Sequence, residues 1–467
     1  MSIQQFSRLT FDVAVIGGGV VGCAVARQLA FSGARVVLIE KGSDILSGAS
    51  KANSAILHTG FDAPPDSLEL QCIRAGHEEY LTIAPKMNLP VLKTGALLVA
   101  WGEADLAKLD QIVAQAHRNG VPDVARIEAA EIRRREPHLS PSLLGGVIVP
   151  REYLIDPWSA PLAYIQQAIA HGAQILRRAE VTEGGFDGRY WDLTTDKGQI
   201  RAGYVINCAG LYGDQLEQRL LGTAHFQIRP RKGQFVVFDK AAAALLNAIL
   251  LPVPSETTKG VVITRTVFGN LLVGPTAEEQ DERDQAQTDK ATLQQLKDIA
   301  ISRIPALATM NVTAIYAGLR PASEQKYYRI RHEPDRHWLT VGGIRSTGLS
   351  AALGLAQHVR QLWEGGEGLS PSSQLHWPQM PNLAENCPRD WQLPDHGEII
   401  CHCELVTRRE IEATFATALP PGDFGGLKRR TRVCMGRCQG FYCAANVAEL
   451  VGDRLTPPLM ETGQNGR

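Results

Sequence analysis

The sequence of 467 residues lacks several features that would place it among membrane, secreted or nucleic-acid-binding proteins. No uninterrupted apolar run reaches the roughly 18 residues that a membrane-spanning helix needs, and the N-terminus MSIQQFSRLT has no charged-then-apolar leader. Lys and Arg number 48 against 49 Asp and Glu, so no overall charge favours nucleic acid or an anionic surface. Tryptophan and tyrosine are sparse and scattered, which predicts no stacking platform for bases. We expect a cytoplasmic protein, with peripheral contact to the inner face of a membrane left open.

Cysteine is scarce over most of the chain and concentrated near its end. Four of the nine cysteines are scattered, whereas five fall within one short C-terminal stretch: Cys401, Cys403, Cys434, Cys438 and Cys443. In a chain without a secretory leader, cysteines predict free thiols, metal ligands or redox groups rather than a disulfide framework. The C-terminal five therefore form a candidate site of their own.

The strongest motif is a set of glycines near the N-terminus. An apolar run over 12–16 precedes the sequence GGGVVG at 17–22, an amphipathic stretch follows, and a second apolar run ends on Glu40. In a nucleotide-binding βαβ unit, Gly17 permits the tight turn, Gly19 lets the backbone approach a pyrophosphate, and Gly22 allows close packing of helix on strand. Glu40 stands where a carboxylate can accept hydrogen bonds from ribose hydroxyls. This order predicts a dinucleotide site.

The pattern of apolar residues predicts an α/β body followed by a connector and a small module. Strand-like runs at 95–100, 233–238 and 338–341 alternate with helical stretches around 66–84, 103–119, 157–172 and 289–303. Residues 365–395 are rich in Pro, Ser, Gly and Asn, which is typical of an extended linker. The length predicts about two or three domains.

The segment after Glu40 indicates which dinucleotide is bound. Residues 47–60 are small, polar and punctuated by glycine, which suits a chain that runs beside an extended cofactor. Here the chain resembles the D-amino-acid-oxidase-like superfamily of FAD enzymes over about 11–360, and most closely its glycerol-3-phosphate and L-2-hydroxyglutarate dehydrogenase branch. The blocks at 204–212 and 342–349 are similar to the family's strand that returns to FAD and to its helix near the flavin pyrimidine. The dipole of that helix can stabilise negative charge on the reduced ring.

The resemblance implies an α/β (α+β) fold and a set of FAD contacts. A Rossmann-like FAD-binding part (about 1–85, 145–220 and 325–364) is interleaved with a mixed-sheet substrate part (about 86–144 and 221–324). A linker at 365–395, a cysteine-ligated domain at 396–455 and a tail at 456–467 complete the chain. The implied FAD-binding residues are Gly17, Gly19, Gly22, Glu40, Lys41, Ser50, Asn53, Ser54, Ala209, Gly210, Gly343, Gly348 and Leu349.

The C-terminal cysteines offer a route for electrons, because no second strand-GxGxxG-helix unit for NAD(P)H follows the first. Thiolates at these spacings bind soft metals or iron–sulfur clusters. The module, with its block RTRVCMGRCQG at 430–440, resembles the bacterioferritin-associated-ferredoxin-like [2Fe-2S] domain. We favour Cys401, Cys403, Cys438 and Cys443 as ligands, with Cys434 as the alternative, for instance in place of Cys443. A zinc ion held by four thiolates stays open as another occupant.

Two residues are candidates for the chemistry on the substrate. His58 resembles an active-site histidine near the flavin in the family and could act as the base. Arg320, in YAGLRPAS, is similar to a family arginine that grips phosphate or carboxylate. Lys259 and Arg345 are weaker candidates for the same pocket. We expect Lys232 to lie in a solvated basic loop, although the family resemblance places its block at the pocket wall. We also expect the acidic run 278–289 to be an exposed loop.

The sequence thus predicts an FAD-dependent dehydrogenase for a small anionic alcohol. The best substrate candidate is sn-glycerol 3-phosphate or a related polyol phosphate, and a 2-hydroxyacid is nearly as good. Electrons would leave through the [2Fe-2S] cluster to a quinone or a protein acceptor. One alternative is an amine or amino-acid dehydrogenase of the opine or proline type. Another is a redox sensor that keeps both cofactors without catalysis.

Overall fold

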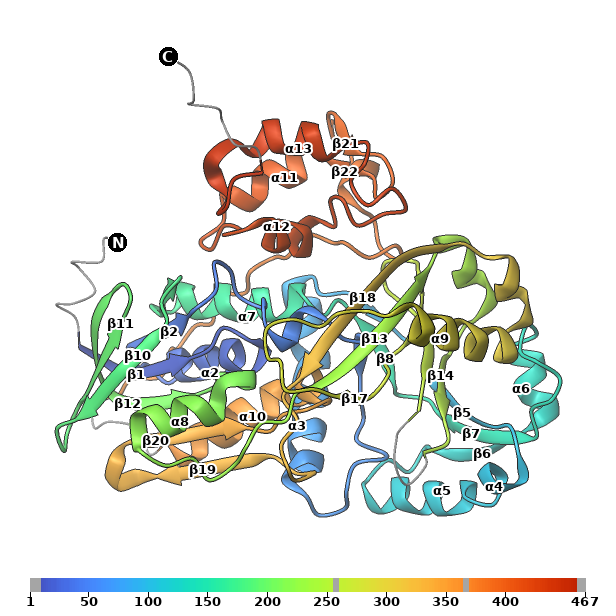
Figure 1. Cartoon of the computed structure of the whole chain (residues 1–467), viewed down its shortest axis with the longest axis horizontal. Coiled ribbons are helices and arrows are strands. Elements are labelled where there is room, and N and C mark those ends of the chain that lie inside the picture. The colour runs from blue at the N-terminus through green and yellow to red at the C-terminus, as the bar shows by residue number, and fades with distance from the viewer. Residues whose placement is uncertain (1–9, 255–259, 364–368, 460–467) are drawn as a thin grey trace.

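The computed structural model describes residues 10–254, 260–363 and 369–459, which form two large sheets and a C-terminal module (Figure 1). The eight-stranded sheet contains β1 (Thr10–Ile16), β2 (Val36–Glu40), β9 (Gln174–Arg177), β10 (Val181–Phe186), β11 (Trp191–Thr195), β12 (Gly198–Asn207), β19 (Arg329–Glu333) and β20 (Trp338–Gly342). Its helices are α2 (Val20–Phe31), α3 (Leu68–Ile83), α7 (Ser159–Ala170), α8 (Gly213–Leu221) and α10 (Gly348–Leu362).

Strand β1 lies inside this sheet, parallel to β2 on one side and to β12 on the other. Its side chains alternate between two apolar cores, as the period of a strand requires. Val13 and Val15 pack in the core that includes α2, α7 and α10, while Ala14 and Ile16 pack in the core that includes α8. Both faces of the sheet are therefore covered, and the carboxyl end of β1 opens next to the first turn of α2.

The part of the molecule before the C-terminal module is called the body, and the eight-stranded sheet with its helices is its first half. The nine-stranded sheet forms its second half. It contains β5 (Ala96–Ala100), β6 (Ala125–Glu128), β7 (Gly145–Val149), β13 (Arg231–Phe238), β14 (Ile249–Pro252), β15 (Val262–Arg265), β16 (Leu271–Gly274), β17 (Glu278–Glu279) and β18 (Val312–Arg320). Its strand pairs are antiparallel except for the parallel pair of β5 and β14. A separate three-stranded sheet consists of β3 (Ile56–Leu57), β4 (Val91–Leu92) and β8 (Tyr153–Ile155), with β8 in its middle.

The helices of the second half follow the sequence pattern with one difference. The stretch 103–119 was expected as one helix, but it forms α4 (Glu103–Leu106) and α5 (Leu109–Arg118). The break falls at Ala107 and Lys108, whose backbone N–H groups bond within the turn that closes α4. The other two helices are α6 (Ala129–Arg135) and α9 (Lys290–Arg303).

The C-terminal module is small and built around its cysteines. It contains β21 (Ile399–Cys401), β22 (Val406–Thr407), α11 (Arg408–Phe415), α12 (Phe424–Thr431) and α13 (Ala444–Val451). The segment 369–395 that leads to it packs on the body, with Leu383 and Ala384 buried and the Met380 N–H bonded to the Met87 carbonyl. No helix in the described ranges is long and apolar enough to cross a membrane.

Candidate active site

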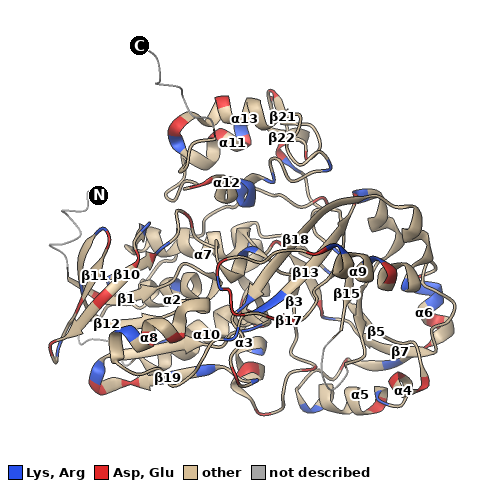
Figure 2. Ribbon diagram, viewed as in Figure 1, with Lys and Arg blue, Asp and Glu red and all other residues tan. Residues whose placement is uncertain are grey.

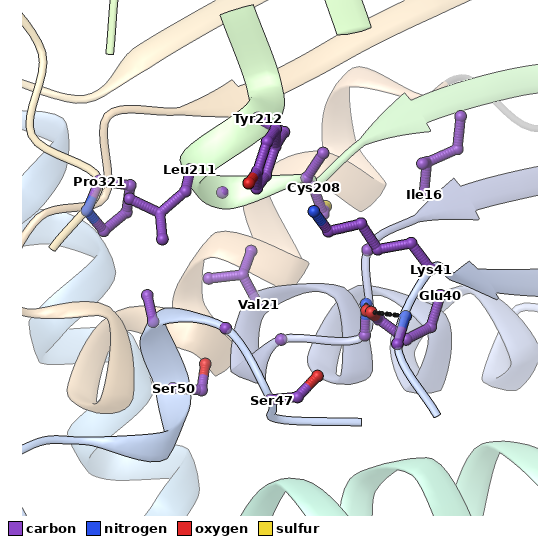
Figure 3. A pocket seen from close by; sticks show the side chains of 18 of the residues that line it. Ile16, Val21, Glu40, Lys41, Ser47, Ser50, Cys208, Leu211, Tyr212 and Pro321 are labelled. Carbon is purple, nitrogen blue, oxygen red and sulfur yellow. Dashed lines mark hydrogen bonds between the residues drawn. The ribbon is translucent and has the colours of Figure 1, made fainter. Parts of the chain in front are cut away.

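A long cavity opens at the carboxyl ends of β1 and β2, beside the N-terminus of α2 (Figure 3). Gly17 has a φ of +112°, and a Cβ there would lie 2.4 Å from the Cys208 carbonyl oxygen. A Cβ on Gly22 would lie 1.9 Å from the Gly17 carbonyl oxygen. Only glycine permits this approach of turn, strand and helix. The backbone therefore leaves room for a pyrophosphate at the helix N-terminus, as FAD requires.

Glu40 joins the glycine turn to the loop that follows β2. Its carboxylate accepts hydrogen bonds from the N–H of Gly18 at 2.6 Å and of Gly42 at 2.7 Å. Burial raises the pKa of Glu40, and these two N–H groups oppose the rise. The carboxylate is thereby fixed at the cavity wall, where each oxygen keeps a lone pair for a ribose hydroxyl.

The acidic run 278–289 is largely exposed and irregular, as expected, but part of it also borders the cavity. Arg283 and Asp284 line the cavity, and Arg283 forms a two-bond ion pair with Asp214 at 2.6 and 2.9 Å. Asp284 accepts a hydrogen bond from the Tyr212 hydroxyl, and the Lys41 ammonium lies 3.4 Å from the centre of the Tyr212 ring. The run therefore closes one side of the cavity, which its composition did not reveal.

A second cavity continues from the first and shares Val20, Ala49, Ser50, Leu319, Pro321, Ile344 and Gly348 with it. The expected FAD residues divide between the two. Those that line the first cavity are Gly17, Gly19, Glu40, Lys41, Ser50, Ala209, Gly210, Gly343 and Gly348. Asn53, Ser54 and Leu349 line the second, together with His58, Arg320 and Arg345. Gly22 contributes packing rather than lining, and Lys259 lies outside the described residues.

His58 is held by the buried carboxylate of Glu152, which no motif in the sequence indicated. Its Nδ1 lies 2.7 Å from Glu152 Oε2, and the Glu152 side chain is fully buried. The other oxygen, Oε1, accepts bonds from the Thr59 N–H at 2.6 Å and hydroxyl at 2.8 Å. Because Nδ1 donates to the carboxylate, the neutral ring carries its basic lone pair on Nε2. This is the arrangement of an oriented general base.

Several cationic groups gather on the wall of the second cavity. Arg320 donates to the carbonyls of Lys232 at 3.1 Å and Thr276 at 2.5 Å, which fixes its guanidinium. Burial, with Arg231 and Arg345 nearby, lowers the pKa of Arg320 to about 10, so it stays charged at neutral pH. The Nε of Arg345 is buried and has no hydrogen-bond partner in the described part of the chain. An anion in the cavity would satisfy that donor.

Lys232 does not lie in the solvated loop that the sequence indicated. It is part of β13, with only 16% of its side chain exposed, and its ammonium lies 3.0 Å from Glu278. The ion pair offsets the charge of Lys232, and the cationic side chains that line the second cavity are Arg231, Arg320, Lys326 and Arg345. Glu69 also lines the second cavity and accepts a bond from the Thr347 hydroxyl at 2.8 Å. Nothing in the local sequence around Glu69 distinguished it from a surface helix residue.

The five C-terminal cysteines lie together, and all nine cysteines of the chain are free thiols. Cys434 Sγ and Cys443 Sγ are 3.4 Å apart, and the side chains of Cys403 and Cys438 are hydrogen-bonded to each other. The backbone N–H of Tyr442 and those of two neighbouring residues lower the pKa of the Cys438 thiol. Backbone donors of this kind favour a thiolate, which is the form that binds iron. Burial raises the pKa of the other four thiols, so Cys438 is the cysteine whose surroundings favour the thiolate.

Contacts between the thiols link Cys403 with Cys438, and Cys443 with both Cys401 and Cys434. Within the described ranges, no three His, Cys, Asp or Glu side chains are placed to hold a single metal ion. A [2Fe-2S] cluster divides its ligands between two irons, so it uses thiols in pairs. All five cysteines take part in these contacts, so the contacts do not reduce the candidate ligands to four.

Comparisons with known proteins give the same two parts. Residues 12–362 match the FAD dependent oxidoreductase family, and residues 399–453 match the BFD-like [2Fe-2S] binding domain. The glycerol 3-phosphate dehydrogenase of Caloramator mitchellensis is 30% identical over 97% of this chain and 96% of its own length. The L-2-hydroxyglutarate dehydrogenase of Salmonella houtenae is 29% identical over 63% of this chain and 71% of its own.

A solved structure extends the likeness to the fold. The dithionite-reduced L-alpha-glycerophosphate oxidase of Mycoplasma pneumoniae, with FAD bound, has a TM-score of 0.72 and 27% identity. The match covers 79% of this chain and all of that one.

Proposed function

The chain belongs to the FAD dependent oxidoreductase family, and we propose that it is a dehydrogenase of a small anionic alcohol. The best candidate substrate is sn-glycerol 3-phosphate or a related polyol phosphate. One observation carries this proposal: an oriented base, His58, and a group of arginines line the same cavity, which continues into the dinucleotide cavity. Oxidation of an anionic alcohol needs both groups, one for the hydroxyl proton and one for the anion.

FAD is the cofactor of this family, and the C-terminal domain is of the [2Fe-2S] type. When bound, FAD supplies the acceptor for the substrate's hydride, and the cluster carries single electrons onward. We assign FAD to the residues of the first cavity and its junction with the second. We propose that the ligands of the cluster are Cys401, Cys403, Cys438 and Cys443, with Cys434 as the alternative. A quinone or an electron-transfer protein is the proposed acceptor.

His58 would remove the proton of the substrate hydroxyl through Nε2. Glu152 stabilises the imidazolium that this transfer creates, because its buried carboxylate lies 2.7 Å from Nδ1. Thr59 fixes the carboxylate by two bonds, and the bond from this fixed carboxylate to Nδ1 in turn orients the ring. An oriented base of this kind typically accelerates proton transfer by about 100- to 10,000-fold.

Arg320 and Arg345 would hold the anionic end of the substrate. The bonds of Arg320 to backbone carbonyls orient its guanidinium, and Arg345 brings an unused buried donor. Their positive charges suit a phosphate, which carries more charge than a carboxylate at neutral pH. This favours a phosphate ester over a 2-hydroxyacid, although a guanidinium can bind either group.

The test is anaerobic reduction of the bound flavin, followed by visible absorption of the full-length protein. We expect rapid bleaching by sn-glycerol 3-phosphate and slow or no bleaching by glycerol, which lacks the anion. L-2-hydroxyglutarate and proline are added separately to the same preparation. Bleaching by L-2-hydroxyglutarate alone would move the substrate to the hydroxyacids, and bleaching by proline alone would overturn the alcohol class.

A matched pair of variants assigns the base. We expect His58→Asn to slow flavin reduction by at least about 100-fold while FAD content stays unchanged. His138→Asn, on an exposed segment of the second half, should reduce its flavin at the rate of the unmodified protein. Equal rates for both variants would remove His58 from the reaction.

A further inference from the structure

The loop that follows Glu40 borders the first cavity, which we assign to FAD and call the FAD cavity, on one side. On the other side it contacts the C-terminal module. Residues 42 and 46–51 line the cavity. Asp44, in the same loop, is fully buried and forms a two-bond ion pair with Arg430 of α12, at 2.5 and 3.1 Å. Figure 2 shows α12 as a basic helix at the base of the module, next to the body. The ion pair therefore joins the module to the loop that forms a wall of the FAD cavity.

Further bonds from the module hold the same loop. Arg429 Nη2 donates to the Ile45 carbonyl at 3.0 Å, and the Ser43 hydroxyl donates to Asp423 at 2.5 Å. The backbones also approach closely, because a Cβ on Gly422 would lie 1.8 Å from the Ser43 carbonyl oxygen. Three consecutive loop residues, 43 to 45, are thus bonded to the segment 423–430 of the module.

The opposite side of the loop is bonded to the glycine turn. The N–H of Leu46 donates to the Gly18 carbonyl at 2.9 Å, and the Glu40 carboxylate bridges the N–H groups of Gly18 and Gly42. The hydroxyl of Ser50 accepts a bond from the Val20 N–H, in the first turn of α2, at 3.0 Å. Movement of Asp44 would therefore displace groups that border the pyrophosphate and ribose sites.

A second route from the module reaches the far end of the loop. The guanidinium of Arg432 lies 4.0 Å from the centre of the Phe268 ring, which stacks on Trp158 at 5.5 Å. The Trp158 indole N–H donates to the Lys51 carbonyl at 3.2 Å, and Lys51 lines the FAD cavity. Both ends of the loop are thus held by arginines that lie just before Cys434.

We propose that Arg430 is a positioning residue for FAD, and that the C-terminal module completes the FAD site by clamping the loop 42–51 through Asp44. The module then has two roles, since it carries the electron exit and also fixes the cofactor. Because binding couplings are reciprocal, bound FAD in turn stabilises the docked module. This inference holds whatever substrate the enzyme oxidises, so it stands or falls separately from the proposed function.

The first experiment measures the dissociation constant of FAD for the full-length protein stripped of flavin, by quenching of FAD fluorescence. We expect Asp44→Asn and Arg430→Met each to raise the constant on the order of tenfold, as couplings between sites commonly do. The double variant should be no weaker than the weaker single variant, because both changes remove one interaction. Arg408→Gln, which breaks an exposed ion pair with Glu398 in the same module, should leave the constant unchanged.

If the ion pair were merely structural, its loss would lower thermal stability without raising the FAD dissociation constant of the folded variants. Equal FAD constants for the unmodified protein and for folded Arg430→Met would overturn the proposal. Ser43→Ala provides a milder change if the arginine variant fails to fold, since it removes one bond to Asp423 without leaving a buried charge. It should weaken FAD binding less than Asp44→Asn but still measurably, and no effect would count against the clamp.

Hydrogen exchange of the unmodified protein gives a readout that needs no variant. On addition of FAD, amides of α12 should become more protected, although α12 does not line the cavity. The exchange of amides in α11, which lies farther from the body than α12 (Figure 1), serves as the internal reference. Unchanged exchange in α12 on saturation with FAD would contradict the reciprocal stabilisation and with it the proposal.

Discussion

His58 and Glu152 are 94 positions apart in the chain, yet their side chains meet at 2.7 Å. The pairing of β3 with β8 explains this, because Leu57 lies opposite Tyr153 in the antiparallel register. The residues that flank this pair, His58 and Glu152, are therefore brought together at the edge of the small sheet. The register of two short strands thus creates the base and its orienting carboxylate.

The first prediction concerns Glu152. Replacement by glutamine keeps a hydrogen-bonding group but removes the negative charge that stabilises imidazolium. We expect Glu152→Gln to lower kcat on the order of 10- to 100-fold and to shift the acidic limb of the kcat/KM profile to lower pH, since the base becomes weaker. Anaerobic stopped-flow reduction of the flavin across pH measures both effects. An unshifted profile would show that Glu152 does not tune the base.

The second prediction concerns the unused donor of Arg345. Charge-assisted hydrogen bonds contribute about 1.5–3 kcal/mol, so Arg345→Met should raise KM for the anionic substrate roughly 10- to 100-fold, with a smaller change in kcat. Steady-state kinetics with an artificial electron acceptor measure the two constants. The control is Arg134→Met on α6, which removes an exposed ion pair with Glu131 and should change neither. A large loss of kcat alone would place Arg345 in the reaction rather than in binding.

The third prediction tests the glycine packing beneath the pyrophosphate site. A methyl group at Gly22 would meet the Gly17 carbonyl oxygen at 1.9 Å, and this backbone oxygen cannot move aside as the end of a flexible side chain could. Gly22→Ala should therefore be purified without FAD and with a lowered midpoint of thermal unfolding. Gly102→Ala is the control, because a Cβ there meets nothing within 4 Å. Retention of FAD by Gly22→Ala would mean that α2 can shift without loss of the site.

The fourth prediction separates the five thiols. We expect Cys443→Ser to lose the visible absorption and the electron paramagnetic resonance signal of the reduced [2Fe-2S] cluster, and Cys434→Ser to keep both. The two sulfurs lie 3.4 Å apart, so each variant is the natural control for the other. The reverse pattern would give the ligand position to Cys434, and retention of the cluster by both would show that either thiol can serve.

Local sequence predicted the elements whose signals are local. The βαβ unit appears as β1, α2 and β2 because strand period, glycine turn and helix pattern stand next to one another in the chain. The same holds for α3, α7 and α9, and for the clustering of the cysteines. The cavity positions of His58 and Arg320 came from resemblance to a family, since neither has a local signature.

Residues that act through distant partners could not be found in this way. Arg283 and Asp284 sit in an acidic run whose composition is that of a solvated loop, and only the tertiary fold turns them toward the cavity. Asp44 and Arg430 are 386 positions apart and belong to different domains. Their ion pair depends on how the module docks, which neither domain's own pattern encodes. Ion pairs between residues far apart in the chain are therefore the features of this site that sequence patterns could not predict.

The last prediction follows from the charge state of Asp44. Burial alone would raise its pKa, but Arg430, with Arg177 and Arg429 nearby, lowers the pKa below the ordinary aspartate value. A group with a depressed pKa contributes its stability above the unfolded-state value of about 3.9 and loses it as pH falls through the lower folded-state value. Asp44→Asn should therefore lower the unfolding midpoint clearly at pH 7, because it leaves a buried Arg430 unpaired.

The difference between Asp44→Asn and the unmodified protein should begin to shrink as pH falls below about 4, where the carboxylate of the unfolded chain takes up a proton. It should close as pH falls through the lower pKa of Asp44 in the folded protein. Unfolding midpoints measured from pH 7 to pH 3 show whether the gap closes. Asp110→Asn is the matched control, because Asp110 is 84% exposed in its pair with Arg126 and should contribute little at any pH. A gap that stays constant down to pH 3 would mean that the Asp44 side chain stabilises the docked module by its shape and hydrogen bonds rather than by its charge.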